Sequence, residues 1–142
     1  MRAQNPHPPL RKSSIGFPMS ALFCALLILP AFATLRLSRT FDPRFLTGYA
    51  AFVSGATYLL YRADKKRAKS GAWRVPEAIL HWAEFFGGWP GAFIAQQTFR
   101  HKTVKISYQI NYWIIVTLHQ FVSFDFLHDW EYSRRLAMSV LP

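Results

Sequence analysis

Apolar residues in this chain are gathered into four blocks, and this grouping restricts the fold more than any other feature. The blocks cover residues 17–35, 45–61, 78–99 and 108–127, with short basic connectors between them. Hydrophobic residues make up 51% of the chain, and a water-soluble domain would divide them between core and surface without such long uncharged runs. The grouping therefore predicts an all-α integral membrane protein.

Three of the blocks are long enough to cross a membrane as helices. Residues 17–35, 45–61 and 108–127 form runs of roughly 17 to 20 residues, and about 20 are needed to cross the hydrocarbon layer. We therefore expect about three transmembrane helices within a single helical membrane domain that covers residues 17–127. A basic, proline-broken lead over 1–16 precedes this domain, and a short tail of mixed charge over 128–142 follows it.

Aromatic residues mark the ends of two of these blocks. Tyr58 and Tyr61 end the second block, and Tyr108, Tyr112 and Trp113 lie near the start of the last one. Tyr and Trp are enriched where a membrane meets water, so we expect these rings to anchor the helices at the interface.

The remaining apolar block is interrupted by the sequence Gly87-Gly88-Trp89-Pro90-Gly91. Glycine relaxes the backbone and Pro90 removes a hydrogen-bond donor, so a helix must break there. Each arm then has about 8 to 12 residues, or roughly 12 to 18 Å of helix, which is too short to cross a core of about 30 Å. The block predicts a re-entrant or interfacial helical hairpin over 76–99, although the counts of flanking charges do not exclude a full crossing.

Basic residues indicate the orientation of the chain in the membrane. With the N-terminus inside, nine Lys and Arg residues of the lead and of the connector over 62–74 face the cytoplasm, against three in the connector over 36–44. This asymmetry favours a bacterial inner-membrane protein with a cytoplasmic N-terminus. A cleaved signal peptide over 17–33 is the alternative, because Ala31-Phe32-Ala33 has the form of a cleavage site, but Arg36 and Arg39 oppose export.

Small residues on the second block form a face on which another helix can approach closely. Gly48, Ala51 and Gly55 are spaced i, i+3 and i+7, and Ala50 and Ser54 lie beside them. We expect this face to serve packing within the molecule, and a homo-oligomer formed through Ala51 and Gly55 is the alternative.

Ionisable side chains recur on one stripe of the broken helix. Glu77, His81 and Glu84 are spaced i, i+4 and i+7, and such groups at membrane depth are candidates for acid/base chemistry. His81, Glu84 and His101 are therefore the candidate catalytic residues. The alternative is structural: Glu77 caps the helix, and His81 and Glu84 pair with basic residues near the head groups.

Too few ligands gather for a metal site and Cys24 is the only cysteine, so we predict neither a metal nor another cofactor.

Two basic clusters come together if the hairpin is re-entrant. One follows the second block and the other follows the hairpin, and together they offer guanidinium, imidazole, ammonium and hydroxyl donors suited to a phosphate or an anionic lipid head group. The predicted anion- or lipid-binding residues are Asp64, Lys65, Arg100, His101, Lys102 and Thr103. The alternative is that these charges only fix orientation.

Short motifs in a fixed order resemble the bacterial membrane proteins grouped as domain of unknown function 1294. They are Asp64-Lys65, Arg74-Val75-Pro76-Glu77, Leu80-His81, Gly87-Gly88-Trp89-Pro90-Gly91-Ala92 and Phe99-Arg100-His101-Lys102-Thr103. The resemblance covers about residues 45–127 and implies an inner-membrane protein of uncharacterised activity. Some relatives carry a cold-shock domain, whose strand pattern and aromatic surface this sequence lacks, so we expect no nucleic-acid partner.

Three functions are consistent with these observations. A small transporter is the least favoured, because a three-span unit would need to oligomerise to line a pathway, and two others remain. The first is a structural or accessory membrane protein with a basic site on its cytoplasmic face and membrane lipids as partners. The second is a small membrane enzyme that acts on a phosphorylated or lipid substrate, with His81 or His101 as acid/base.

Overall fold

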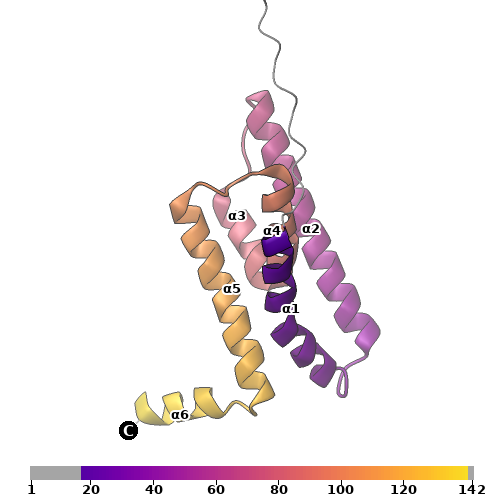
Figure 1. The fold of residues 1–142 in the computed structure, drawn as a ribbon, viewed down its shortest axis with the longest axis vertical. Helices are drawn as coiled ribbons and strands as arrows, with labels where there is room; N and C mark the ends of the chain where they lie inside the picture. Colours follow the sequence, from indigo (N-terminus) through magenta and orange to yellow (C-terminus); the bar gives the residue numbers. More distant parts are fainter. Residues whose placement is uncertain (1–16, 141–142) are drawn as a thin grey trace, which may run out of the picture.

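The computed structural model describes residues 17–140, and these form an all-helical structure (Figure 1). The predicted lead over 1–16 lies outside the described residues. The helices are α1 (Phe17–Leu37), α2 (Pro43–Ser70), α3 (Glu77–Ala83), the π-helical turn η1 (Glu84–Gly88), α4 (Trp89–Phe99), α5 (Ile106–Leu127) and α6 (Glu131–Val140). In Figure 1 the turn from α1 to α2 lies at the lower end, while the segments on either side of α3 and α4 lie at the upper end.

Helix α2 is longer than the apolar block that predicted it. The basic connector continues the helix to Ser70, because Ala, Lys and Arg favour helix and no glycine or proline intervenes. The helix ends at Gly71, whose left-handed backbone (φ 67°) directs its N–H to the carbonyl of Arg67. At the other end, Asp42 accepts a hydrogen bond from the N–H of Arg44 at 2.8 Å and caps the helix.

The segment from α3 to α4 is a helical hairpin whose two ends lie side by side. Its backbone leaves helical geometry at Phe86 (ψ 16°) and Gly87 (φ 100°), close to the predicted break. Asp64 on α2 accepts a hydrogen bond from the N–H of Val75, just before α3, and also contacts His101, just after α4. Both ends therefore meet the same residue of α2. The segments that flank α3 and α4 lie at the upper end of the molecule (Figure 1).

The tip of the hairpin packs closely against the middle of α2. A Cβ atom added at Gly91 would lie 1.9 Å from the carbonyl oxygen of Ser54, and one added at Gly88 would lie 1.9 Å from the hydroxyl of Thr57. Ser54 is ten residues before Asp64, so the hairpin extends about 15 Å along α2 at 1.5 Å per residue. It reaches roughly half the thickness of a membrane core.

Most of the small-residue face that we predicted to pack within the molecule does not do so. A Cβ atom added at Gly48 or at Gly55 would have no neighbour within 4 Å, and Ala51 is exposed. The interpretation of that face as an internal contact is therefore wrong for Gly48, Ala51 and Gly55, whereas Ser54 beside them does meet another helix. The hairpin uses the neighbouring face of α2, which carries Ser54 and Thr57, because its own glycines allow the close approach.

Helix α1 packs along α5 and reaches α4. The rings of Phe23 and Phe93 stack with centroids 5.0 Å apart, and the side-chain amide of Gln120 donates to the carbonyl of Leu26 at 2.9 Å. At the lower end Arg36 donates to the carbonyls of Phe126 and Leu127, each at 2.8 Å. These contacts hold α1 along most of its length.

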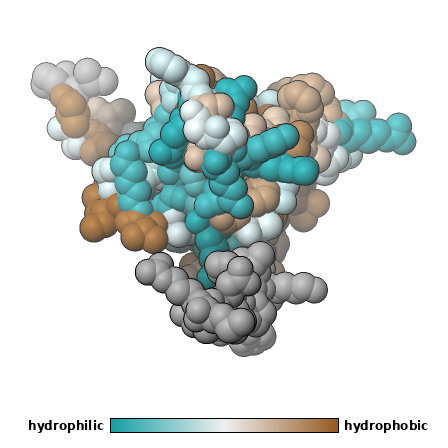
Figure 2. Space-filling view, turned by 90° about the horizontal axis from the view of Figure 1, so that it is seen from above, coloured by the Kyte–Doolittle hydropathy of each residue, from teal (hydrophilic) through white to brown (hydrophobic). Residues whose placement is uncertain are grey.

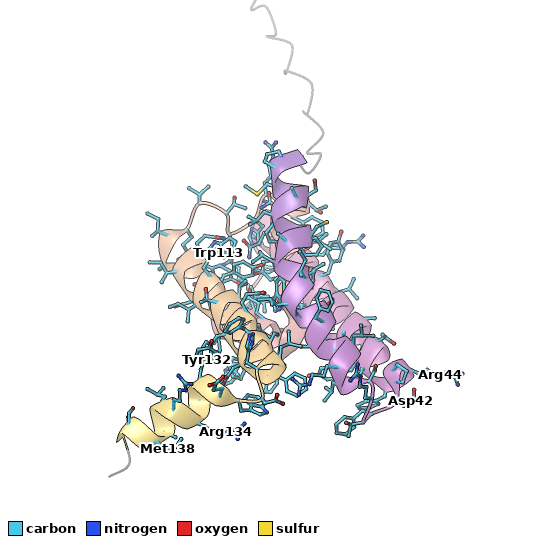
Figure 3. All side chains as sticks on the ribbon, turned by 60° about the horizontal axis from the view of Figure 1, so that its bottom comes forward. Asp42, Arg44, Trp113, Tyr132, Arg134 and Met138 are labelled. Atoms are coloured by element: carbon cyan, nitrogen blue, oxygen red, sulfur yellow. The ribbon has the colours of Figure 1, made fainter. Side chains whose placement is uncertain are left out.

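Helix α6 turns across the end of α5 in the part of the chain predicted as a tail. Asp125, buried near the end of α5, accepts hydrogen bonds from the N–H groups of Tyr132 and Ser133 at 3.0 and 3.2 Å and so caps α6. Figure 3 shows α6 leaving α5 at a steep angle, with Tyr132, Arg134 and Met138 along it.

Large apolar side chains are exposed on the outside of the structure, and several charged side chains are buried beside its apolar core. Large apolar side chains such as Phe52, Trp82 and Ile114 are at least 60% exposed, whereas Asp64, Glu84 and Asp125 are fully buried. Within the described residues one helical stretch, Pro18–Leu37, is long and apolar enough to cross a membrane by length and composition.

Candidate functional site

A basic groove of about 360 Å³ lies at the upper end, beside the two ends of the hairpin. Figure 2, which views the molecule from this end, shows hydrophilic residues gathered over the middle of the face and hydrophobic ones at its margins. The residues that line the groove are Arg74, Glu77, Arg100, His101, Lys102, Thr103, Val104 and Lys105.

Asp64, which lies beyond the apolar part of α2, is buried next to the groove and contacts residues that line it. Its carboxylate is fully buried and contacts the imidazole Nε2 of His101 at 2.7 Å, the N–H of Val75 at 3.1 Å and, more distantly, the Nε of Arg74 at 3.7 Å. Burial opposes the charged form, but the hydrogen bond from His101 and the charge of Lys102 outweigh it and hold the pKa of Asp64 below its usual value. The carboxylate therefore remains ionised and orients the imidazole.

Glu77 holds two lysines at the rim of the groove. Its carboxylate accepts hydrogen bonds from Lys102 at 2.5 Å and from Lys105 at 2.8 and 2.9 Å. These hydrogen bonds lower the pKa of Glu77 to about 2. Two carboxylates, Asp64 and Glu77, thus face four permanent cations, and the groove keeps an excess of positive charge.

The structure brings together part of the predicted anion-binding set. Asp64, His101 and Lys102 form one cluster, with Lys102 Nζ 3.9 Å from the carboxylate of Asp64. Arg100 and Thr103 line the same groove, but Lys65 is not among its lining residues.

Sequence reasoning missed three residues of this groove. Neither Arg74 nor Lys105 is given a place in the predicted site. Glu77 is predicted either as part of the ionisable stripe with His81 and Glu84 or as a helix cap, and no side-chain cap is present at the start of α3. The signal was available for Glu77, because an acidic residue beside a strongly basic loop is expected to find a cation.

A second polar network surrounds Glu84 inside the molecule. The fully buried carboxylate accepts hydrogen bonds from the hydroxyls of Tyr61 and Tyr108, the latter at 2.8 Å, and contacts His81 Nδ1 at 2.8 Å. The imidazole also stacks on the ring of Tyr108, with centroids 4.2 Å apart. The prediction of Tyr61 and Tyr108 as interfacial anchors is therefore wrong, because both rings are buried to satisfy this carboxylate. Glu84 pairs with His81 and the two phenols rather than with the basic residues of the structural alternative.

Two glutamines connect this network to the loop after α4. The side-chain amide of Gln96 donates to the hydroxyl of Tyr61 at 3.1 Å and accepts from the amide of Gln109 at 2.6 Å. Gln109 also donates to the carbonyl of Lys102 at 2.9 Å. Neutral amides gave no chemical signal in the sequence, so both residues were missed.

Across residues 17–140, no group of three or more His, Cys, Asp or Glu side chains is placed to hold a metal ion. The candidate site is instead a basic groove backed by a carboxylate–imidazole pair, with a second such pair deeper in the hairpin.

These features define an all-helical protein built around a broken hairpin, with ionisable residues at its base and core. A family model described as "Protein of unknown function (DUF1294)" matches residues 54–108, which confirms the family that the sequence motifs indicated. The matched region runs from Ser54, against the hairpin tip, to Tyr108, and so includes Asp64, Glu84 and His101. No curated protein and no solved structure matches this chain.

Proposed function

We propose that the protein is a multi-pass inner-membrane protein in which α1, α2 and α5 cross the bilayer and α3–α4 is re-entrant from the cytoplasmic side. Helices α2 and α5 have 28 and 22 residues, enough to cross a core of about 30 Å. Several of the polar residues that reduce their apolar content, such as Thr57, Tyr61 and Tyr108, are buried. The exposed apolar side chains described above support contact with lipid on the outside of the bundle.

In this arrangement α1 is a retained helix rather than a cleaved signal. The helix continues without interruption through Ala31 and Ala33, and its far end is tied to α5 by Arg36. Cleavage after Ala33 would separate that arginine from most of the helix.

We infer that the basic groove binds a phosphate-bearing group or an anionic lipid head group at the cytoplasmic face. The observation that carries this inference is that carboxylates hold the basic side chains of the groove in place. Asp64 contacts the imidazole of His101, and Glu77 accepts hydrogen bonds from Lys102 and Lys105. Charges that only set orientation need no such positioning. The guanidinium groups of Arg74 and Arg100 can each donate two parallel hydrogen bonds to the oxygens of a phosphate.

Calorimetric titration of the purified protein with glycerol 3-phosphate tests the head-group site. Arg100→Lys keeps the charge but loses the planar fork, and we expect affinity to fall about tenfold. Arg134→Lys, at the opposite end of the molecule, is the matched control and should bind as the unaltered protein does. Equal affinity for all three proteins would overturn the proposal.

A small membrane enzyme is the second candidate, favoured by the two carboxylate–imidazole pairs. Such a carboxylate orients an imidazole for acid/base work. His101 lines the groove, where it would meet a bound phosphate group, while Glu84 orients His81 deeper in the hairpin. His101→Gln should then abolish turnover of a phosphorylated lipid and leave binding within a few-fold. Comparison of the membrane lipids of cells with and without the protein would reveal the substrate, and identical lipids and metabolites would contradict this candidate.

A further inference from the structure

A second groove opens beside the basic one, between α1, α4 and α5. It holds about 580 Å³, within the range of about 300 to 1,000 Å³ that is usual for ligand pockets. Met19 and Leu22 of α1, Phe93 of α4 and Trp113 of α5, which is labelled in Figure 3, are among the residues that line it.

The two grooves share part of their lining. Arg100, Thr103 and Val104, in the segment that follows α4, border both of them. A single molecule can therefore place one part among the cations of the basic groove and another part between α1 and α5.

The polarity of the second groove changes along its length. Near the shared segment it is lined by the amides of Gln96 and Gln109, which belong to the buried polar network. Farther along α4 the lining becomes apolar at Phe93, seven residues before Arg100, or about 10 Å along the helix. This order of cation, amide and apolar surface matches the order of phosphate, glycerol ester and acyl chain in a phospholipid.

We propose that the second groove binds the first part of an acyl chain, so that the ligand of the basic groove is an anionic phospholipid rather than a soluble phosphate compound. The proposal rests on the proposed head-group site. Charge complementarity selects the anionic head, and the continuous path past Arg100 connects the head to the chain. A soluble anion would occupy the basic groove and leave the apolar walls without a partner.

The test compares two probes on variants of the full chain in detergent. Leu22→Trp and Met19→Trp each fill the groove from partly exposed positions on α1, and Leu59→Trp places the same side chain on the exposed surface of α2 as the matched control. Native mass spectrometry measures retention of dioleoyl phosphatidylglycerol, and calorimetry measures binding of glycerol 3-phosphate.

We expect Leu22→Trp and Met19→Trp to retain about tenfold less phosphatidylglycerol and to bind glycerol 3-phosphate as the unaltered protein does, while Leu59→Trp changes neither. Retention that is equal in all three variants would overturn the acyl-chain inference, as would a parallel loss of glycerol 3-phosphate binding. Lys105→Gln, which lines only the basic groove, distinguishes the two proposals. This variant should retain less phosphatidylglycerol and bind glycerol 3-phosphate more weakly. If neither measurement changes, the head-group site itself is overturned.

Discussion

At the scale of single residues, the most demanding group is the buried carboxylate of Glu84. A charge or acid in an apolar interior is stable only when its hydrogen bonds are satisfied, and here two phenols and an imidazole satisfy it. Within the described residues, no buried side-chain nitrogen or oxygen lacks a hydrogen-bond partner.

Glu84→Ala is therefore expected to destabilise the fold by about 1 to 3 kcal/mol. The hydroxyls of Tyr61 and Tyr108 lie 2.6 Å apart, so one can donate to the other, but the second loses its buried acceptor. Thermal unfolding in detergent measures the effect. Glu131→Ala removes a carboxylate from an exposed pair with Arg135 and serves as the control, with a change below about 1 kcal/mol. Equal losses in the two variants would contradict the assigned role of Glu84.

Glu77, at the rim of the groove, makes a pH-dependent contribution to the stability of the fold. Its pKa is lowered from 4.5 to about 2 by hydrogen bonds from Lys102 and Lys105. Because the folded pKa is the lower one, the stabilisation is complete above about pH 4.5 and is lost as the pH falls toward 2. The melting temperature of the unaltered protein should approach that of Glu77→Gln as the pH falls from 7 to 3, and a constant difference would contradict this assignment.

Residue types in the sequence predicted part of the site, and the limit has a physical reason. Asp64, His101 and Lys102 were identifiable because charged groups near apolar runs need partners. Tyr61, Tyr108 and Gln96 were not, because aromatic and amide side chains occur both at an interface and in a core. Only the three-dimensional position of Glu84 assigns them a role.

At the scale of elements, the contact of the hairpin with α2 depends on glycine. The sequence predicted where the helix breaks, since Gly87 and Pro90 act on the local backbone. It did not predict which face of α2 receives the tip, because the residues on both faces are small: Gly48 and Gly55 on one, Ser54 and Thr57 on the other.

Gly91→Ala should displace the hairpin, because the added methyl group would lie 1.9 Å from the backbone oxygen of Ser54. We expect a loss of about 1 to 3 kcal/mol from this overpacking. Gly48→Ala is the matched control: its site is open, so higher helix propensity should leave stability unchanged or raise it by up to about 1 kcal/mol. Thermal unfolding compares the two, and a Gly91→Ala protein as stable as the control would contradict the described packing.

At the scale of the whole molecule, the proposed topology places both ends of the hairpin on the cytoplasmic side. The apolar blocks predicted the helices well, because each block must bury or shield its backbone as a unit. They could not predict whether the hairpin is re-entrant or crosses the membrane, since the positive charges near its ends are consistent with both arrangements.

Cysteine labelling in intact cells tests this topology. In a Cys24→Ser background, Thr103→Cys should resist a membrane-impermeant thiol reagent, because it lies at the upper, cytoplasmic end. Thr40→Cys, in the turn between α1 and α2, should react and confirm that the reagent has access. Both positions are exposed in the structure. Labelling of Thr103→Cys from outside would exclude the re-entrant arrangement.

The dependence of the hairpin tip on α2 also has a consequence for the order in which the protein is assembled. Near its turn, the carbonyl of Phe86 accepts a hydrogen bond from the hydroxyl of Tyr49, and Gly88 and Gly91 lie directly against that helix. In lipid, a non-helical turn without such a partner exposes polar backbone to hydrocarbon. In the proposed topology, residues 77–99 therefore have no stable place in the bilayer before α2 occupies it, and synthesis from the N-terminus delivers α2 first. A chain that begins after α2 should leave the hairpin at the membrane surface, where its two arms can meet water.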